Sequence, residues 1–492
     1  MNNKTLKQSI FFNSIKQICM LIFPLITIPY VTRTLGTGGY GKYVFATSYI
    51  SYFAYIASFG VATYGVRECS KIKDKPKQLN ILFSELLNIN LLFTVISYVL
   101  LFISIVCVQK LHNYSLLITM YSISIGLTTV GADWINTVFE EYEYITIRYI
   151  VIQIIAMILM FALVKTSDDV VNYCIISLFA SAGGNLLNIG YIRRRVRYTF
   201  KSGLNISKHF KSLLIFFISS LGILIYVNSD ITMLGMFLND KDVGIYSFGS
   251  KLYGMLKTVV YSIISTSAAR MAYLIKKDND EYYRYMDKIF TLIILILFPL
   301  CVGSIMLNKN IIAVIGGPEY LNGSDILIVL ISTLPFAIMC SYFSSLILII
   351  NNQERIMLIS TMISAISNII LNLLFIPLYG ALGAAFTTLI AEFISFSISF
   401  VSTRKFFDYK KINLKTFYAV IMECLAIVLI CFTTNIWMSP NTKYYDMSKI
   451  LICVLLSGFS YIIILFNSRD TSIKELIDPF LLKIRNQIKT KE

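Results

Sequence analysis

The sequence predicts an all-α integral membrane protein, and three observations lead to that prediction. Of its 492 residues, 57% are apolar and 14% are charged, whereas about a quarter of the residues of a soluble protein are charged. The mean hydropathy is +0.72, and a soluble fold has no core large enough to bury so much apolar surface. The apolar residues also fall into stretches of roughly 20, the length that a helix needs to cross the hydrocarbon.

Breaks at charged residues and at Gly, Pro or Asn divide the chain into 14 candidate spans. They are expected near residues 10–32, 43–66, 81–108, 114–139, 146–164, 170–191, 212–236, 243–268, 289–307, 325–350, 356–376, 380–402, 416–435 and 449–466. Pro24 and Pro29 interrupt the first span and no small-residue cleavage site follows it, so we do not expect a cleaved signal peptide.

The positions of the basic residues predict the orientation in the membrane. Most of the 43 Lys and Arg fall in alternate loops, and their main clusters are at 67–77, 193–211, 270–288, 404–415 and after 469. Because cytoplasmic loops carry an excess of Lys and Arg, these loops are expected inside, and an even number of spans places both termini there. Orientation accounts for the net charge of +16, and we expect no nucleic-acid partner.

The sequence lacks the residue patterns that several kinds of functional site need. The nine cysteines are scattered singly without a CxxC pair, and the two histidines, His112 and His209, lie far apart. These spacings do not suggest a disulfide framework, a metal site or a His-based catalytic dyad. The chain has no nucleotide-binding glycine motif. We therefore expect no cofactor and no metal, and a role in transport rather than an enzyme.

A short glycine pattern occurs twice. Leu35-Gly36 and then Gly41-Lys42-Tyr43 lie where the first span ends and the second begins, and Leu234-Gly235 and then Gly244-Ile245-Tyr246 lie where the seventh ends and the eighth begins. Recurrence at the same point six spans later indicates duplication of a six-helix bundle.

The duplication predicts three parts of the chain. The first lobe is expected at residues 1–200 and the second at 201–411. Residues 412–492 are expected to add two further spans and a basic cytoplasmic tail.

Two motifs resemble those of a known family. One is the turn Arg-x-Leu-Gly-x-x-x-Tyr-Gly from Arg33 to Gly41, and the other is Asn372-x4-Pro377-x2-Gly380-x2-Gly383-Ala384-Ala385. Together with the length and the span count, they resemble the Wzx-type polysaccharide flippases of the multidrug/oligosaccharidyl-lipid/polysaccharide exporter superfamily.

The resemblance implies two six-helix lobes around a central cavity that opens alternately to each side. The implied cargo is a polyprenyl-diphosphate-linked oligosaccharide, moved from the inner to the outer leaflet of the bacterial cytoplasmic membrane for O-antigen, capsule or exopolysaccharide assembly. The implied partners are membrane lipids, a polysaccharide polymerase and a chain-length regulator.

The eighth span carries the sharpest candidates for cargo binding. At 100° per residue, Tyr253 and Lys257 lie within about 20° of Tyr246, and Tyr261 lies within about 60°. Lys251 lies about 120° around the helix from Lys257. An ammonium group can pair with a phosphate, and phenol rings can stack on sugars. In the alternative interpretation, Lys251 reaches the head groups and the tyrosines form an interfacial belt.

Five other charged residues are candidates for binding, gating or coupling, because charges within spans are costly. Arg33 is expected either to line the cavity or to have a structural role, capping its own helix or pairing with Asp230. Lys42 is likewise expected to have either a cavity role or a structural one. Asp230 and Glu392 are candidate gate partners or proton carriers. Arg270 either meets head groups or anchors the helix at the cytoplasmic face.

Two further acidic features are expected to be ordinary. Glu423 is expected near the cytoplasmic end of its span, where solvent reaches it. The run Glu140, Glu141 and Glu143 lies in a cytoplasmic loop, where it either bridges to the basic loops or is solvated.

Other functions remain open at this point. A lipid II flippase of the same superfamily shares the expected plan. A multidrug antiporter commonly has twelve spans and an acid in its first span, where this chain has Lys16 and no acid. A polysaccharide polymerase needs catalytic residues on a large external loop, and the expected external loops are short.

Overall fold

The computed structural model describes residues 6–199, 206–406, 414–438 and 445–467, and every regular element in those ranges is a helix. Contacts divide the chain into two compact units, residues 1–247 and 248–492. The expected division at residues 200 and 411 stays a prediction. The basic tail after residue 469 lies outside the described residues.

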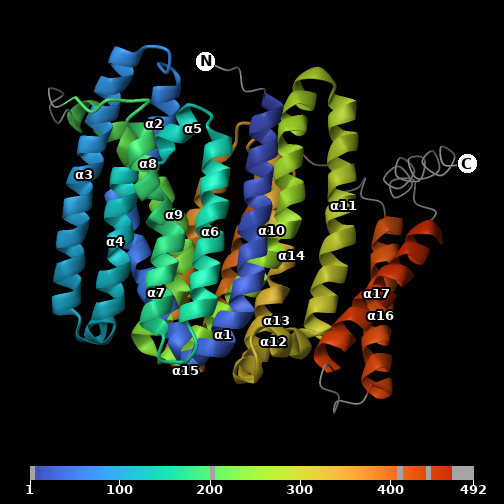
Figure 1. Ribbon diagram of the computed structural model, residues 1–492. Coiled ribbons are helices and arrows are strands. Elements are labelled where there is room, and N and C mark those ends of the chain that lie inside the picture. The colour runs from blue at the N-terminus through green and yellow to red at the C-terminus, as the bar shows by residue number, and fades with distance from the viewer. Residues whose placement is uncertain (1–5, 200–205, 407–413, 439–444, 468–492) are drawn as a thin grey trace, which may run out of the picture. The chain divides into compact units, whose positions relative to one another are not determined.

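Unit 1 contains long helices joined by short helical turns (Figure 1). Its elements are α1 (Leu6–Ser58), α2 (Val61–Ser70), α3 (Pro76–Cys107), η1 (Gln109–Tyr114), α4 (Ser115–Gly131), α5 (Trp134–Val138), α6 (Tyr142–Leu163), α7 (Val170–Leu178), η2 (Phe179–Gly183), α8 (Gly184–Ile192), α9 (Ile206–Phe237) and the start of α10 (Asp240–Lys277).

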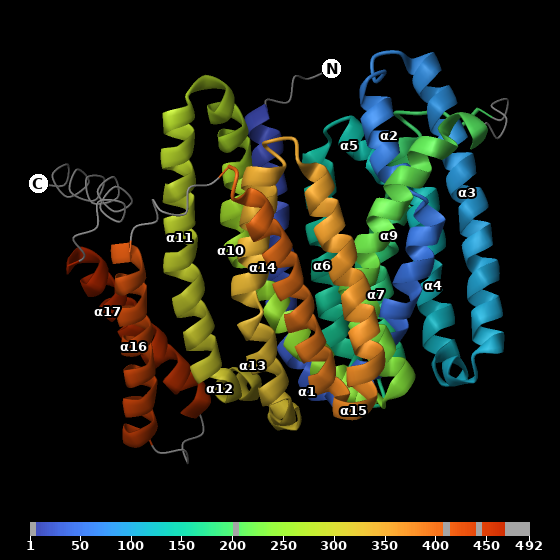
Figure 2. The same ribbon diagram turned by 180° about the vertical axis from the view of Figure 1, so that it is seen from behind.

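Unit 2 contains the rest of α10 and the helices that follow it (Figure 2). Its further elements are α11 (Asn279–Met306), α12 (Asn308–Ile315), η3 (Pro318–Gly323), α13 (Ser324–Ser332), α14 (Leu334–Tyr342), η4 (Phe343–Leu348), α15 (Glu354–Thr403), α16 (Leu414–Trp437) and α17 (Tyr445–Asn467).

A glycine bends each of the two longest helices. Gly36 in α1 has φ 66° and Gly380 in α15 has φ 62°, a left-handed conformation that residues with a Cβ rarely adopt. Figure 2 shows the two arms of α15 meeting at its labelled end. The arms are bonded to each other, because Ser364 Oγ donates to the Ala391 carbonyl at 2.6 Å. Both bends lie between spans that the sequence separates.

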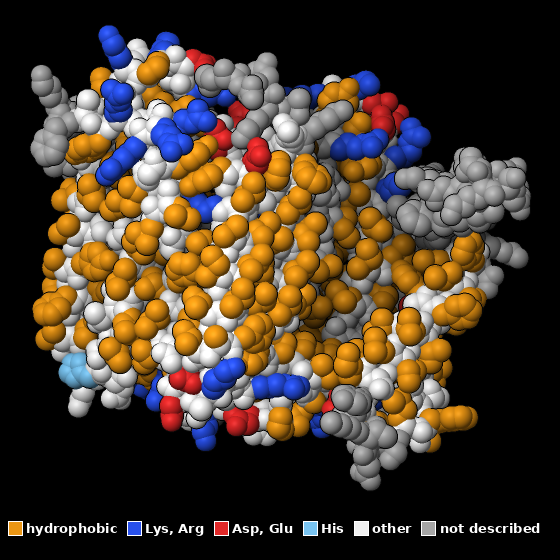
Figure 3. Space-filling model, viewed as in Figure 1, with side chains coloured by type: hydrophobic (Ala, Val, Ile, Leu, Met, Phe, Trp, Pro, Cys, Tyr) orange, Lys and Arg blue, Asp and Glu red, His pale blue; other side chains and the backbone are white. Residues whose placement is uncertain are grey.

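Helix length and composition confirm the predicted class, an all-α membrane protein. Among the described residues, eleven helical stretches are long and apolar enough to cross a membrane, and a bent pair within α9 makes a twelfth. Figure 3 shows hydrophobic side chains over the middle of the helices and charged ones toward their ends. The count of 14 stays a prediction, because α1 and α15 each hold a bend within one continuous helix.

One predicted boundary is wrong. The span expected at residues 43–66 is interrupted at Phe59 and Gly60, which have φ 40° and 73°. The short helix α2 begins after them. The apolar pattern runs through this break, so hydropathy alone does not reveal it.

The repeated glycine turns meet within unit 1. A Cβ on Gly41 would lie 1.8 Å from the carbonyl oxygen of Asp240, and one on Gly244 would lie 2.0 Å from that of Thr37. The second arm of α1 therefore touches the start of α10 backbone to backbone, a distance that only glycine permits.

Side chains from the turn between α3 and α4 hold the same region. Tyr114 Oη donates to Asp240 Oδ1 at 2.5 Å. Lys110 Nζ donates to the carbonyl oxygens of Met236 and Leu238, at 3.0 and 2.6 Å. A cation at the C-terminal end of α9 satisfies carbonyl groups that the helix leaves unpaired.

Candidate functional site

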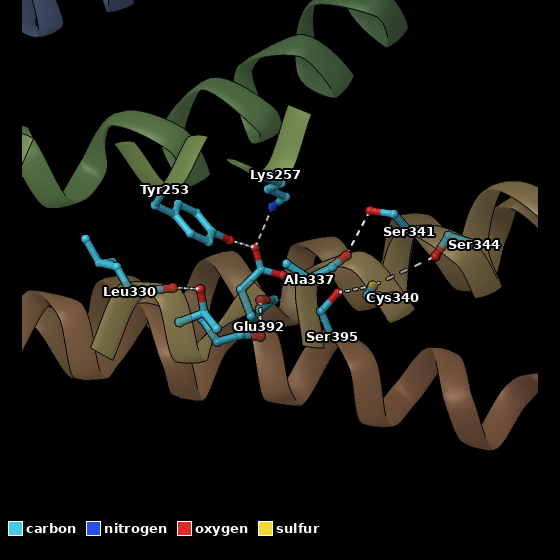
Figure 4. A network of polar contacts seen from close by, with 12 residues as sticks. Tyr253, Lys257, Leu330, Ala337, Cys340, Ser341, Ser344, Glu392 and Ser395 are labelled. Carbon is cyan, nitrogen blue, oxygen red and sulfur yellow. Dashed lines mark hydrogen bonds and ion pairs between the residues drawn. The ribbon is translucent and has the colours of Figure 1, made fainter. Parts of the chain in front are cut away.

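An ion pair inside unit 2 forms the centre of the candidate site (Figure 4). Lys257 Nζ on α10 lies 2.8 Å from Glu392 Oε1 on the second arm of α15. Tyr253 Oη donates to the same oxygen at 3.4 Å. The side chain of Glu392 is 7% exposed and that of Lys257 is 30% exposed. Glu392 is therefore the more deeply buried partner of the pair.

Helix periodicity explains why α10 presents these groups together. Tyr253 and Lys257 are four residues apart, so they lie one above the other on the same face. The ammonium lies 5.6 Å from the centre of the Tyr253 ring, within the distance of a cation–π contact.

A row of small polar side chains follows Glu392 along α15. Ser395 and Ser399 follow it at helical spacing, and both are buried. Cys340 Sγ lies 3.2 Å from Ser395 Oγ, and Ser344 Oγ lies 3.4 Å from Ser399 Oγ. These contacts join α15, the element that carries Glu392, to α14 and to the π-helical turn η4.

A second predicted acid lies in unit 1. Asp230 is buried on α9 and accepts a hydrogen bond of 2.5 Å from Tyr246 Oη, which is also buried. A polar patch accompanies it, because Ser48 Oγ on α1 lies 3.3 Å from both Asn228 Oδ1 and Thr232 Oγ1. The predicted pairing of Asp230 with Arg33 stays a prediction.

The remaining candidates take no part in the ion pair. Arg33, Lys42, Lys251 and Tyr261 are exposed. Arg270 is exposed too, and its guanidinium lies 3.5 Å from Glu281 and 4.8 Å from the centre of the Tyr285 ring. The structure thus joins Lys257, Tyr253 and Glu392 and joins Tyr246 to Asp230.

Sequence reasoning missed a buried polar triad in unit 1. His209 Nδ1 lies 2.9 Å from Tyr64 Oη, and its Nε2 lies 3.0 Å from Glu85 Oε2. All three residues are buried, and they connect the start of α9 to α2 and α3. A polar residue in an apolar stretch was visible in the sequence at Glu85, but its partner lies 124 residues away.

A second missed ion pair joins the start of α5 to α6. Arg148 Nη2 donates to Asp133 Oδ1 at 2.5 Å, and Asn136 Nδ2 donates to the same oxygen at 2.8 Å. The acidic run of the sequence lies next to this pair. Glu140 pairs with Lys73 at 3.0 Å, and Glu141 pairs with Arg195. The acidic run therefore bridges to both basic loops.

The expectation for Glu423 is wrong. Glu423 lies on α16 in unit 2 and is 1% exposed. Ser460 Oγ on α17 donates to its two carboxyl oxygens at 3.3 and 3.2 Å. The packing of α17 against α16 removes it from solvent, and a single-span pattern does not show that packing.

Comparison with known proteins gives the family. The family model described as "Polysaccharide biosynthesis protein" matches residues 6–269, more than half of the chain. The chain belongs to the polysaccharide biosynthesis protein family. This confirms the resemblance to polysaccharide flippases that the glycine motifs suggested.

Curated relatives of this family member are named as transporters and flippases. A putative O-antigen transporter of Escherichia coli (strain K12) is 20% identical over 425 residues, which cover 82% of this chain and 98% of that protein. A putative O-antigen transporter of Shigella dysenteriae is 23% identical over 75% of this chain and 93% of that protein. A probable low-salt glycan biosynthesis flippase of Haloferax volcanii is 24% identical over 42% of this chain and 44% of that protein.

A solved structure shares the fold. It is the lipid II flippase MurJ in an inward closed conformation, with a TM-score of 0.73 over 92% of this chain and 98% of that one. The two sequences are 19% identical, so the likeness concerns the fold of the polysaccharide biosynthesis protein alone.

Proposed function

We propose that this protein is a flippase that moves a polyprenyl-diphosphate-linked oligosaccharide from the inner to the outer leaflet of the bacterial cytoplasmic membrane. The names of its relatives and its many apolar helices support this function. We also propose that both termini are cytoplasmic, since that orientation places the basic loops inside. The Lys257–Glu392 ion pair is the observation that links this function to particular residues.

Lys257 is the proposed contact for the diphosphate. An ammonium group has three N–H donors, and Glu392 takes one of them. The Lys257 side chain is 30% exposed, and its remaining donors are proposed to meet phosphate oxygens, which form strong charge-assisted hydrogen bonds with a cation. Tyr253 offers an aromatic ring beside the same ammonium. Arg33, Lys251, Tyr246 and Tyr261 are proposed as further cavity contacts.

Glu392 gives the empty site a defined charge. When no cargo is bound, the carboxylate neutralises the ammonium; when a diphosphate arrives, it competes with the carboxylate for Lys257. The same carboxylate helps to release the cargo, because re-forming the pair offsets the loss of phosphate contacts. Asp230, Lys42 and Arg270 are proposed as additional gating or coupling residues.

The membrane potential can drive such a cycle. A diphosphate carries roughly two negative charges, and each charge that crosses 100 mV is worth about 2.3 kcal/mol. Outward movement from a negative interior is therefore favoured by about 4–5 kcal/mol at that potential. The paired, neutral site returns without electrical work.

The test measures the leaflet distribution of the lipid-linked oligosaccharide in a deletion strain with an impermeant sugar-oxidising label. Wild-type protein is expected to restore labelling of complete units on the outer leaflet, and Lys257→Ala is expected to restore it poorly. Lys276→Ala is the matched control, because Lys276 is an exposed lysine on the same helix. Normal delivery of complete but unpolymerised units in the deletion strain would indicate a polymerase instead.

A lipid II flippase is the second candidate, because the protein of that function shares the fold. The two candidates differ in the group that the lipid diphosphate carries. Rescue of cells depleted of their own lipid II flippase would favour this alternative.

A further inference from the structure

A cavity of about 260 Å³ lies in unit 2 among α11, α12, α16 and α17. Figure 2 shows α16 and α17 next to α11. Its wall is mostly apolar and includes Leu300, Leu307, Ile427 and Val454. Glu423 is the one acidic residue among the described residues that line it.

Glu423 has a hydroxyl partner and no basic one. Its hydrogen bonds come from Ser460 Oγ, and among the described residues no Lys, Arg or His lies within 4.0 Å of its carboxyl oxygens in an ion pair. Tyr461 follows Ser460 on α17, but its hydroxyl donates to the Leu295 carbonyl at 2.7 Å. A carboxylate that is buried without a counter-ion is costly, so the carboxyl either stays protonated or gains a cation, and a cation bound in this cavity would stabilise its charged form.

We propose that the cavity binds a lipophilic organic cation, such as a hydrophobic amine or a quaternary ammonium, with Glu423 as its counter-ion. The site is separate from the Lys257–Glu392 pair, and the proposal goes beyond the flippase function without depending on it. The apolar wall favours the hydrocarbon part of the ligand. The ring of Tyr461, which lines the cavity, offers a cation–π contact.

Charge complementarity selects this ligand over two others. A neutral isoprenoid chain would fill the apolar space but leave the carboxyl protonated, without the charge-assisted contact that a cation gains there. An anion would add repulsion at Glu423. A cation with an apolar body satisfies both the wall and the carboxylate.

The test is equilibrium binding of tritiated 1-methyl-4-phenylpyridinium to the full chain in nanodiscs of zwitterionic lipid. Wild-type protein is expected to show saturable binding, and Glu423→Gln is expected to bind at least about tenfold more weakly, since contacts to a charged group are worth about 1.5–3 kcal/mol. Glu354→Gln is the matched control, because it removes an exposed carboxylate in the same unit outside the cavity.

A second variant separates the charge from the space. Ile427→Trp fills the cavity, keeps Glu423 and is expected to abolish binding, with thermal unfolding of each variant recorded to show that it is folded. An absence of saturable binding to the wild type would overturn the proposal. Equal binding by the wild type and Glu423→Gln would overturn it too. So would binding that a neutral polyprenol displaces equally from the wild type and from Glu423→Gln. The assay contains no oligosaccharide, so failure of the flippase function would not affect it.

Discussion

Loss of the Lys257 ammonium should destabilise this protein more than loss of the Glu392 charge, because the two partners are buried to different depths. Lys257→Met leaves a carboxylate whose side chain is 7% exposed without its cation. Breaking a buried pair costs about 3–5 kcal/mol, and the 30% exposure of Lys257 reduces the expected loss to about 2–3 kcal/mol. Glu392→Gln leaves the partner that is less deeply buried, with a side chain that is 30% exposed, so its expected cost is smaller, about 1 kcal/mol.

The double variant measures the interaction itself. Lys257→Met with Glu392→Gln should be less destabilised than the sum of the two single variants, by about 1–2 kcal/mol. The free energy of unfolding is measured by denaturant titration in mixed micelles, with Lys276→Met as the control on the same helix. Additive single effects, or a larger loss from Glu392→Gln than from Lys257→Met, would refute the reasoning.

Three other substitutions test features of the fold. Gly41→Ala should lower the unfolding free energy by about 1–3 kcal/mol, because its Cβ would lie 1.8 Å from a carbonyl oxygen of α10; Gly38→Ala, with its nearest neighbour at 3.9 Å, should not. Gly380→Ala should cost about 1–2 kcal/mol in the same titration, because its φ is 62°, and an unchanged midpoint would contradict this. His209→Ala should lower the melting temperature more than His209→Gln, which can still donate to the buried Glu85.

Much of the fold could be predicted from the sequence because a helix that crosses the membrane needs a long apolar stretch. The apolar stretches predict the helices, and Gly36 and Gly380 fall at the breaks between expected spans. The break at Phe59 and Gly60 was not predicted, since a single glycine within a continuous apolar stretch is a weak signal for a break. The contact between Gly41 and Gly244 was also beyond prediction, because the repeat shows that the turns are alike and not that they touch.

The candidate site could be predicted in part. Helix periodicity places Tyr253 and Lys257 on one face, as the structure does. Their partner Glu392 is 135 residues further along the chain, and one sequence does not show pairing over that distance. The same reason explains the missed triad around His209. For Glu423 the sequence predicted solvent access where the structure shows burial, since its position within one span did not reveal the helix that covers it.

The bend at Gly380 has a consequence for the biogenesis of the protein. The first arm of α15 carries Asn368 and Asn372, both buried, and Thr387 on the second arm donates to Asn372. An arm released alone into lipid would expose these amides to hydrocarbon, where unsatisfied polar groups are costly. We therefore expect the translocation machinery to hold the first arm until the second has emerged, so that the pair partitions into the bilayer as one hairpin.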